Sequence, residues 1–191
     1  MNKINKKWII IGGILFLILM MGGSCVSKYN RLVTLDEGVT AAWAQVENVL
    51  QRRNDLIPNL VNTVKGFAAQ EKDVFLGVAK ARSRVAGAKA VNQKVQASQA
   101  MDSALSRLML VVERYPEIKS NQNFLALQDE LAGTENRLTV ERKRYNESVQ
   151  HYNVVVKRFP TNMVAGLMGF EKKDAYFQVE EEAKEVPKVE F

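Results

Sequence analysis

Apolar residues follow two different patterns along the chain. The run Trp8 to Val26 carries no charged residue and consists mainly of Ile, Leu, Met, Gly and Phe. Beyond it, apolar residues recur in alternating steps of three and four, which is the spacing of one face of an α-helix. No segment shows the strict apolar and polar alternation that is typical of a strand. The pattern predicts an all-α protein in which a single N-terminal transmembrane helix leads into a helical domain.

The uncharged run is long enough to cross a membrane once. At about 1.5 Å per residue it spans roughly 28 Å, which is close to the thickness of the bilayer hydrocarbon. Lys3, Lys6 and Lys7 precede the run, whereas the basic residues that follow it are soon joined by acids. This bias predicts a cytoplasmic N-terminus, an anchor at residues 1–26 and a domain at residues 27–191 on the outer side of the membrane.

Cys25 offers a second interpretation of the same segment. Gly23, Ser24 and Cys25 follow a basic and then an apolar region, as in a lipoprotein signal whose cysteine is acylated after cleavage. Such signals usually carry leucine three residues before the cysteine, where this chain has Gly22. An uncleaved helix is therefore favoured and lipidation at Cys25 is the alternative. Both interpretations tether the domain to a membrane.

The helical spacing predicts a first long helix from Leu35 to Val85, continuous with the membrane segment. Pro58 lacks an N–H group, so we expect a kink near Asn54, with a break at Gly66 as the alternative. Large apolar residues disappear over residues 86–100, which predicts a chain reversal there.

Two further long helices are predicted after the reversal. The second covers about residues 95–115 and ends before Pro116. The third begins near Ser120, a possible N-cap, and runs to Val156. A short apolar patch at residues 163–170 and an acidic helical piece at 176–184 follow. The domain is therefore predicted to be an antiparallel bundle of three long helices plus a short fourth helix.

Composition and charge limit the function more than they define it. The 191 residues favour one domain, and the formal charge is +6. The three lysines before the apolar run supply half of that charge, and no basic cluster or nucleic-acid module is present, so nucleic acid is not an expected partner. One cysteine and one histidine, His151, cannot build a disulfide framework or a site of several thiolates or imidazoles. We therefore expect no metal and no cofactor.

Several segments resemble the LemA family across nearly the whole chain beyond the anchor. They are the stretch Tyr29 to Glu37, Ala42 to Glu47, Gln51 to Val61 with its arginine, aspartate and proline, Arg144 to Asn146, Tyr152 and Asn153, Phe159 and Pro160, Gly169 and Phe170, Tyr176 and Phe177, and Pro187 to Phe191. The resemblance implies a single N-terminal membrane helix and a helical-bundle domain. It implies no established activity, and one branch of the family is linked to magnetosome membranes. Cys25 departs from the family pattern, which leaves the choice between a helical and a lipid anchor open.

Polar residues gather on both sides of Pro58. Arg52, Asp55, Asn59 and Asn62 step by three, four and three, so they share one polar face of the helix. Arg53 falls at a core position, where a guanidinium needs carboxylate or carbonyl partners. We favour a buried polar network that fixes helix register around Pro58. A binding patch for a headgroup or a partner is the alternative.

Two Tyr-Asn pairs lie one heptad apart, at Tyr145 with Asn146 and at Tyr152 with Asn153. Asparagine is a poor helix former, and inside a helix its side chain is suited to hydrogen bonding with a neighbouring helix. We expect these pairs to specify register, and we expect His151 to be a surface or interhelical residue.

The most apolar part of the domain runs from Phe159 and Pro160 to Phe170. We expect it to cap one end of the bundle. The alternative is an exposed surface for a partner subunit or for the membrane interface.

The chain lacks the motifs of an enzyme. It has no Gly-x-Ser-x-Gly turn, no glycine-rich phosphate loop after a strand, and one possible histidine base. The favoured hypothesis is a non-enzymatic scaffold that is anchored in the envelope membrane and binds itself or other envelope proteins. An accessory or regulatory subunit of an envelope protease or phosphatase is the alternative. A hydrolase would instead require a pocket with convergent titratable groups.

Overall fold

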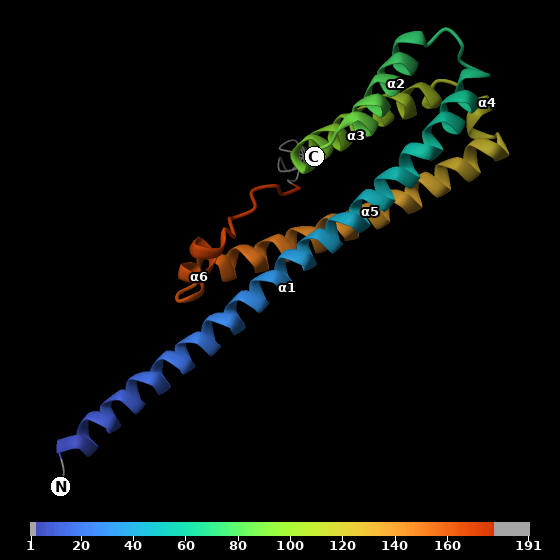
Figure 1. Cartoon of the computed structure of the whole chain (residues 1–191). Coiled ribbons are helices and arrows are strands. Elements are labelled where there is room, and N and C mark those ends of the chain that lie inside the picture. Colours follow the sequence, from blue (N-terminus) through green and yellow to red (C-terminus); the bar gives the residue numbers. More distant parts are fainter. Residues whose placement is uncertain (1–2, 178–191) are drawn as a thin grey trace, which may run out of the picture. The chain divides into compact units, whose positions relative to one another are not determined.

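The computed structural model describes residues 3–177 and, from Trp8 onward, their side chains (Figure 1). Within this range the regular secondary structure is entirely α-helical. The helices are α1 (Lys3–Lys65), α2 (Lys72–Gly87), α3 (Val91–Glu113), α4 (Pro116–Lys119), α5 (Gln122–Lys157) and α6 (Thr161–Met168). Of the acidic piece predicted to be helical, Tyr176 and Phe177 are described and are not helical. Residues 178–184, and the family-like ending from Pro187 to Phe191, lie outside the described residues.

The predicted helix from Leu35 to Val85 is wrong, and the break at Gly66 is confirmed. The Gly66 N–H donates to the Asn62 carbonyl at 3.2 Å, and the chain then turns before α2 begins. Ala68 in this turn is fully buried. The apolar pattern therefore keeps its phase across the turn although the chain leaves the helix. Four long helices result in the described chain, where three were predicted.

α1 continues through Pro58, and α2 supplies what the proline lacks. The N–H of residue 58 in a helix would donate to the carbonyl of Asn54, but proline has none. The Arg82 Nε of α2 donates to that carbonyl at 3.3 Å. A side chain from the next helix thus satisfies the main-chain acceptor that Pro58 leaves open.

The boundaries of α3 and α5 differ from the prediction by a few residues. α3 begins at Val91, so the reversal occupies only residues 88–90. Ala97 and Ser98 are buried, which shows that the small residues interpreted as a loop form a closely packed helix face. The N-cap of α5 is Asn121 and not Ser120, because the Asn121 Oδ1 accepts a hydrogen bond from the Phe124 N–H at 3.0 Å.

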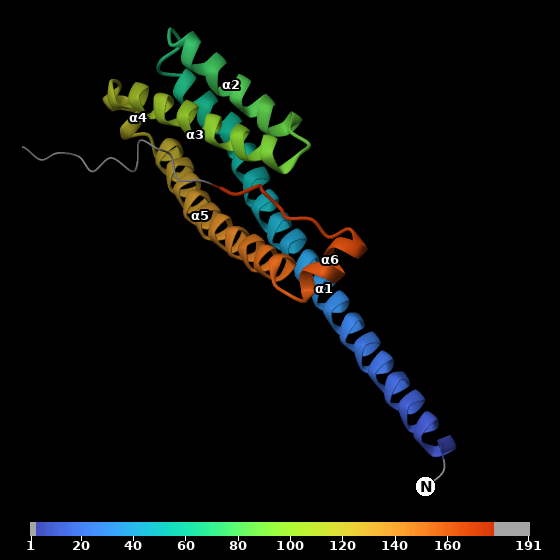
Figure 2. The same cartoon turned by 90° about the vertical axis from the view of Figure 1, so that its left-hand side faces the viewer.

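The described residues form two compact units, each with its own buried side chains. The first comprises the residues up to Ala41 together with Glu147–Lys173. Its buried residues include Leu32, Val149 and Ala165, and α6 lies beside α1 within it (Figure 1 and Figure 2). The second comprises Ala42–Asn146 together with residues 174–177. Its core draws on α1, α2, α3, α4 and α5, with Leu60, Leu108 and Ile118 almost fully buried.

Among the described residues, α1 is the helix with a segment apolar and long enough to cross a membrane. The large side chains of that segment are exposed, from Trp8 at 69% to Met21 at 68%. A helix of this composition with no protein covering it matches a membrane segment better than a core helix. The expected association with a membrane is therefore supported.

Candidate functional site

A cluster of four charged side chains joins three helices of the second unit. Arg53 of α1 is 7% exposed and forms ion pairs with Asp102 of α3 and, at 2.7 Å, with Glu135 of α5. Arg142 of α5 pairs with the same two carboxylates, at 3.3 Å and 3.8 Å, and also donates to the Ser98 hydroxyl. Two cations and two anions compensate one another, as a buried charge requires.

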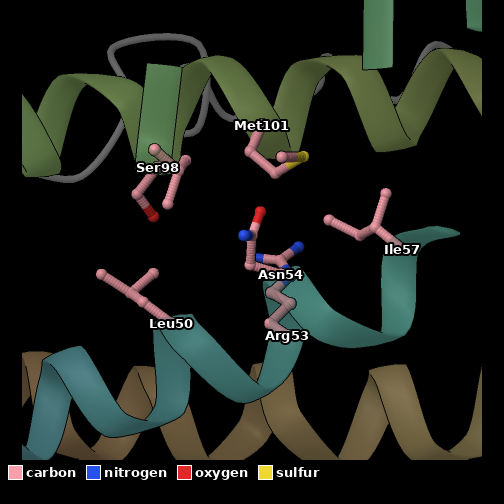
Figure 3. A pocket seen from close by; sticks show the side chains of 7 residues that line it. Leu50, Arg53, Asn54, Ile57, Ser98 and Met101 are labelled. Atoms are coloured by element: carbon pink, nitrogen blue, oxygen red, sulfur yellow. The ribbon is translucent and has the colours of Figure 1, made fainter. Parts of the chain in front are cut away.

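A small cavity adjoins this cluster (Figure 3). It is lined by Leu50, Arg53, Asn54, Ile57, Val85, Ser98 and Met101 and has a volume of about 10 Å³. Figure 3 shows the Asn54 side chain extending from α1 toward α3. A cavity of this size has room for about one water molecule and none for an organic substrate.

Two other hollows in the described part of the second unit also lack convergent reactive groups. An open hollow of about 340 Å³ lies at the turn between α2 and α3, and Arg84 is its one titratable lining residue. A hollow of about 80 Å³ beside α1 contains Glu47 and Lys94, which pair with each other. Neither arrangement brings a nucleophile together with a base, which the hydrolase hypothesis would require.

The polar residues around Pro58 divide between the core and solvent. Arg53 enters the charged cluster, whereas Arg52, Asp55, Asn59 and Asn62 are exposed. Arg52 pairs with Glu130 of α5 at 2.7 Å, with 59% of the arginine side chain exposed. Asp55 accepts a hydrogen bond from Gln51 one helical turn earlier, at 2.9 Å. The four exposed residues share one solvent-facing side of α1.

In the first unit, Tyr152 and Asn153 bind an extended segment and not a neighbouring helix. The Asn153 amide donates to the Lys173 carbonyl at 2.7 Å and accepts from the Lys173 N–H at 2.9 Å. The Tyr152 hydroxyl donates to the Glu171 carbonyl at 3.0 Å. The Lys173 side chain pairs with Asp36 of α1 at 2.8 Å and lies over the Tyr152 ring. Asn153 thus binds extended chain here, where a neighbouring helix was the expected partner.

In the second unit, Asn146 repeats this arrangement one heptad earlier. Its amide donates to the Phe177 carbonyl at 2.8 Å and accepts from the Phe177 N–H at 3.0 Å. The Phe177 ring packs against Trp43 and Tyr145, with the guanidinium of Arg142 at 5.2 Å from its centroid. The partner of Asn146 is again extended chain, because a residue without helical hydrogen bonds offers a free N–H and carbonyl to a side-chain amide.

Both tyrosines resist ionisation. Burial raises the pKa of Tyr145 above its ordinary value, and the Tyr176 phenol raises it further. Burial also raises the pKa of Tyr152, with additional contributions from the negative charges of Asp36 and Glu171. Both phenols stay protonated at neutral pH, so the Tyr152 hydroxyl remains a hydrogen-bond donor.

The other predicted residues are distributed over the surface of the first unit. Phe159 and Pro160 are exposed between α5 and α6, and Phe170 contacts Tyr29 with ring centroids 5.8 Å apart. His151 is exposed, and Cys25 is a free, exposed cysteine in the apolar segment of α1. Over the part of the chain described, no three His, Cys, Asp or Glu side chains lie close enough to share a metal ion.

Sequence reasoning missed the partners of the residues it selected. The sequence contained one indication that Asp102 and Glu135 lie near the core. Each carboxylate interrupts or borders an apolar stripe, near Met101 and near Leu131. Their pairing with Arg53 depends on how α1, α3 and α5 pack. For Phe177 the only signal was its place in a family-like pair.

Comparison with known proteins identifies relatives of the chain. The LemA family profile matches residues 42–191. Magnetosome protein MamQ 2 of Paramagnetospirillum magneticum is 29% identical over 180 residues, covering 79% of this chain and 65% of that protein. Magnetosome protein MamQ of Magnetospirillum gryphiswaldense is 28% identical over 176 residues, covering 78% of this chain and 64% of that protein. The chain therefore spans just under two thirds of the length of these relatives.

Proposed function

The chain belongs to the LemA family, and from this premise we propose that it is a membrane-anchored, non-enzymatic scaffold or interaction protein of the bacterial cell envelope that associates with itself. The observation that carries the proposal is the continuity of α1. One helix runs from the exposed apolar residues near Trp8 to the buried Leu32 and on to Lys65. The charged and amide groups of the candidate site support the same role, since they hold helices and extended chain together.

In this proposal the N-terminus is cytoplasmic and the helices beyond the membrane segment form an antiparallel bundle on the outer side. The lysines at positions 3, 6 and 7 support this orientation. Protease added to intact cells or spheroplasts tests it. We expect degradation of the domain without permeabilisation, and full protection in intact cells with degradation after lysis would reverse the orientation.

Self-association is tested by two measurements on the full chain. In mild detergent, light scattering coupled to size exclusion should give a mass above that of one 21.5 kDa chain. In native membranes, oxidation should crosslink Cys25 of two copies, because this free cysteine is exposed on α1. Cys25→Ser is the matched control. A monomeric mass with no co-purifying protein and no crosslink would overturn the scaffold.

The exposed polar face of α1, formed by Arg52, Asp55, Asn59 and Asn62, favours a second candidate function. Such a face would suit an accessory or regulatory subunit that contacts an envelope protease or phosphatase. The test compares both activities in membranes that contain the wild-type chain, no chain, or the Asn59→Ala, Asn62→Ala double variant. We expect a loss of activity without the chain and with the double variant. Unchanged activity in all three membranes would exclude the accessory role.

A further inference from the structure

One side of α6 is apolar and uncovered. Phe159, Met163 and Leu167 follow one another at intervals of four residues and are 76%, 61% and 83% exposed, and the adjacent Met168 is 59% exposed. The opposite side carries Thr161, Val164 and Ala165, which are buried. We call Phe159, Met163 and Leu167 the α6 ridge, because Met168 lies one turn after the buried Val164 and is exposed at the helix end. The helix contains no charged residue. The ridge is therefore an apolar surface whose exposure to water is unfavourable, and an exposed apolar surface marks a site of contact with protein or lipid.

The chain after α6 fixes the ridge near the end of the membrane segment. Gly169 adopts φ +77° and ends α6, and the Phe170 N–H then donates to the Ala165 carbonyl at 2.9 Å. This left-handed turn, which glycine adopts without steric cost, directs Phe170 onto Tyr29 of α1. Tyr29 lies three residues beyond Val26, the last residue of the uncharged run. The chain directly after α6 therefore contacts α1 close to the end of the apolar run, and Figure 2 shows α6 beside α1.

Basic residues precede the ridge in the sequence and also follow the apolar run of α1. Lys157 and Arg158 precede it and are exposed, and Lys28 and Arg31 follow the apolar run on α1. Glu171, just after Phe170, is the nearest acid along the chain on this side, while Asp36 is paired with Lys173. An apolar ridge with a basic border is the combination that binds at the interface of an anionic bilayer.

We infer that the α6 ridge inserts into the interfacial region of the same bilayer that α1 crosses, and makes a second membrane contact for the first unit. The occupant of the ridge is lipid: acyl chains against Phe159, Met163 and Leu167, and phosphate headgroups against Lys157 and Arg158. This inference rests on the proposed membrane anchoring of α1. Two points of attachment would hold the first unit against the membrane surface, where one helix alone would leave it free to lean.

Depth-dependent fluorescence quenching tests the inference on the full chain. Cys25→Ser removes the single native cysteine, and Leu167→Cys, Leu17→Cys and Gln150→Cys are then made separately and labelled with an environment-sensitive nitrobenzoxadiazole dye. Leu167 and Gln150 are both exposed in the first unit, and Leu17 lies within the apolar run. Each chain is reconstituted into vesicles of phosphatidylcholine and phosphatidylglycerol that carry a nitroxide at a shallow or a deep acyl position.

We expect the dye at residue 167 to lose fluorescence with the shallow nitroxide and to resist iodide. The dye at residue 17 should respond to the deep nitroxide, and the dye at residue 150 should respond to iodide alone. If residue 17 is quenched by lipid but residue 167 behaves like residue 150, the inference is wrong while the anchor stands. If residue 17 is not quenched by lipid, the anchoring itself fails.

Two further outcomes show whether lipid, a protein surface or the dye itself accounts for the fluorescence at residue 167. A dye at residue 167 that is shielded from both quenchers would mean that a protein surface, such as a second copy of this chain, covers the ridge, and would overturn the inference. Met163→Glu in the Leu167→Cys chain should reduce quenching by the shallow nitroxide, because a carboxylate resists entry among acyl chains. Gln150→Glu is the matched charge control and should leave it unchanged. Equal quenching in the Met163→Glu chain would show that the dye alone enters the bilayer, and would contradict the inference.

Discussion

The Arg82 Nε donates to the main-chain carbonyl of Asn54 at 3.3 Å, and this is the carbonyl that the missing N–H of Pro58 leaves without its helical partner. The bond ties α2 to the C-terminal part of α1 within the second unit. It also explains how α1 tolerates a proline in its interior. The Arg82 side chain thus supplies the hydrogen-bond donor that proline lacks at position 58.

Arg82→Met should lower the free energy of unfolding by about 1 kcal/mol, the typical net value of one hydrogen bond. In a Pro58→Ala background the cost should shrink, because the N–H of an alanine at position 58 can bond the Asn54 carbonyl. Chemical unfolding of the four chains in mild detergent, followed by circular dichroism, completes the double-mutant cycle. Equal costs in both backgrounds would show that Arg82 does not compensate for the proline.

Neighbouring arginines should differ in their importance. Arg53→Ala removes a buried cation and leaves Asp102 and Glu135 facing Arg142 alone, so it should cost about 3 kcal/mol. Arg52→Ala removes an exposed pair with Glu130 and should cost less than about 1 kcal/mol. The same unfolding measurement compares them. Similar losses for the two variants would contradict the assignment of Arg53 to a buried cluster.

The two asparagines should each protect one main-chain amide. Asn153→Leu removes the acceptor of the Lys173 N–H, a bond of about 1 kcal/mol, so hydrogen exchange at Lys173 should become about fivefold faster. Asn146→Leu should do the same at Phe177. Residue-resolved exchange by mass spectrometry provides the readout, and each variant is the control for the other. If either variant left its own amide protected, the side-chain amide would not be what holds the segment.

High pH should weaken the fold through Tyr145 and Tyr152. Both pKa values are raised above 10.0 in the folded chain, so the unfolded chain releases these protons first as the pH rises. Stability from the two phenols is fully present below pH 10 and is lost as the pH climbs through the raised values. Tyr152→Phe should flatten part of the decline in melting temperature above pH 10, and Tyr145→Phe with Tyr152→Phe should flatten more. An unchanged slope in the double variant would contradict this linkage.

Gly169 should be sensitive to a side chain although nothing lies within 4 Å of the position that its Cβ would occupy. Its φ of +77° costs an L-residue roughly 1–2 kcal/mol. Gly169→Ala should therefore destabilise the first unit by about that amount and weaken the packing of Phe170 on Tyr29. Gly166→Ala, in the same helix but with ordinary φ, is the control. Melting curves that coincide for the two variants would show that the left-handed turn is not required.

The existence and type of the helices could be predicted from the sequence, because long segments with a 3.6-residue period have few alternatives. The turn after α1 was predicted only as the alternative at Gly66, since the buried Ala68 continues the apolar phase and favoured an unbroken helix. The start of α3 was placed too late, since Asn92, Gln93 and Lys94 lack the large apolar side chains that mark a helix face in the core. Boundaries of this kind depend on which helices meet, and periodicity within one helix carries no such information.

For the candidate site, residue type was a better guide than residue spacing. An arginine at an apolar position indicated that Arg53 needs carboxylate or carbonyl partners, and the structure supplies the carboxylates of Asp102 and Glu135. The heptad spacing of Asn146 and Asn153 suggested a neighbouring helix, but both amides bind extended chain instead. A side-chain amide matches any free N–H and carbonyl pair, so its chemistry specifies the groups it binds and not the element that offers them.

α1 is continuous from Val26 to Leu32, so no flexible hinge separates its apolar segment from the packed part of the first unit. A transmembrane helix adjusts its tilt when the hydrocarbon thickness changes. Here the tilt would pass directly to the residues packed around Leu32, because a helix with continuous main-chain hydrogen bonds bends little over two turns. If α1 crosses a bilayer as proposed, a thinner or thicker bilayer would change the angle between that bilayer and the first unit.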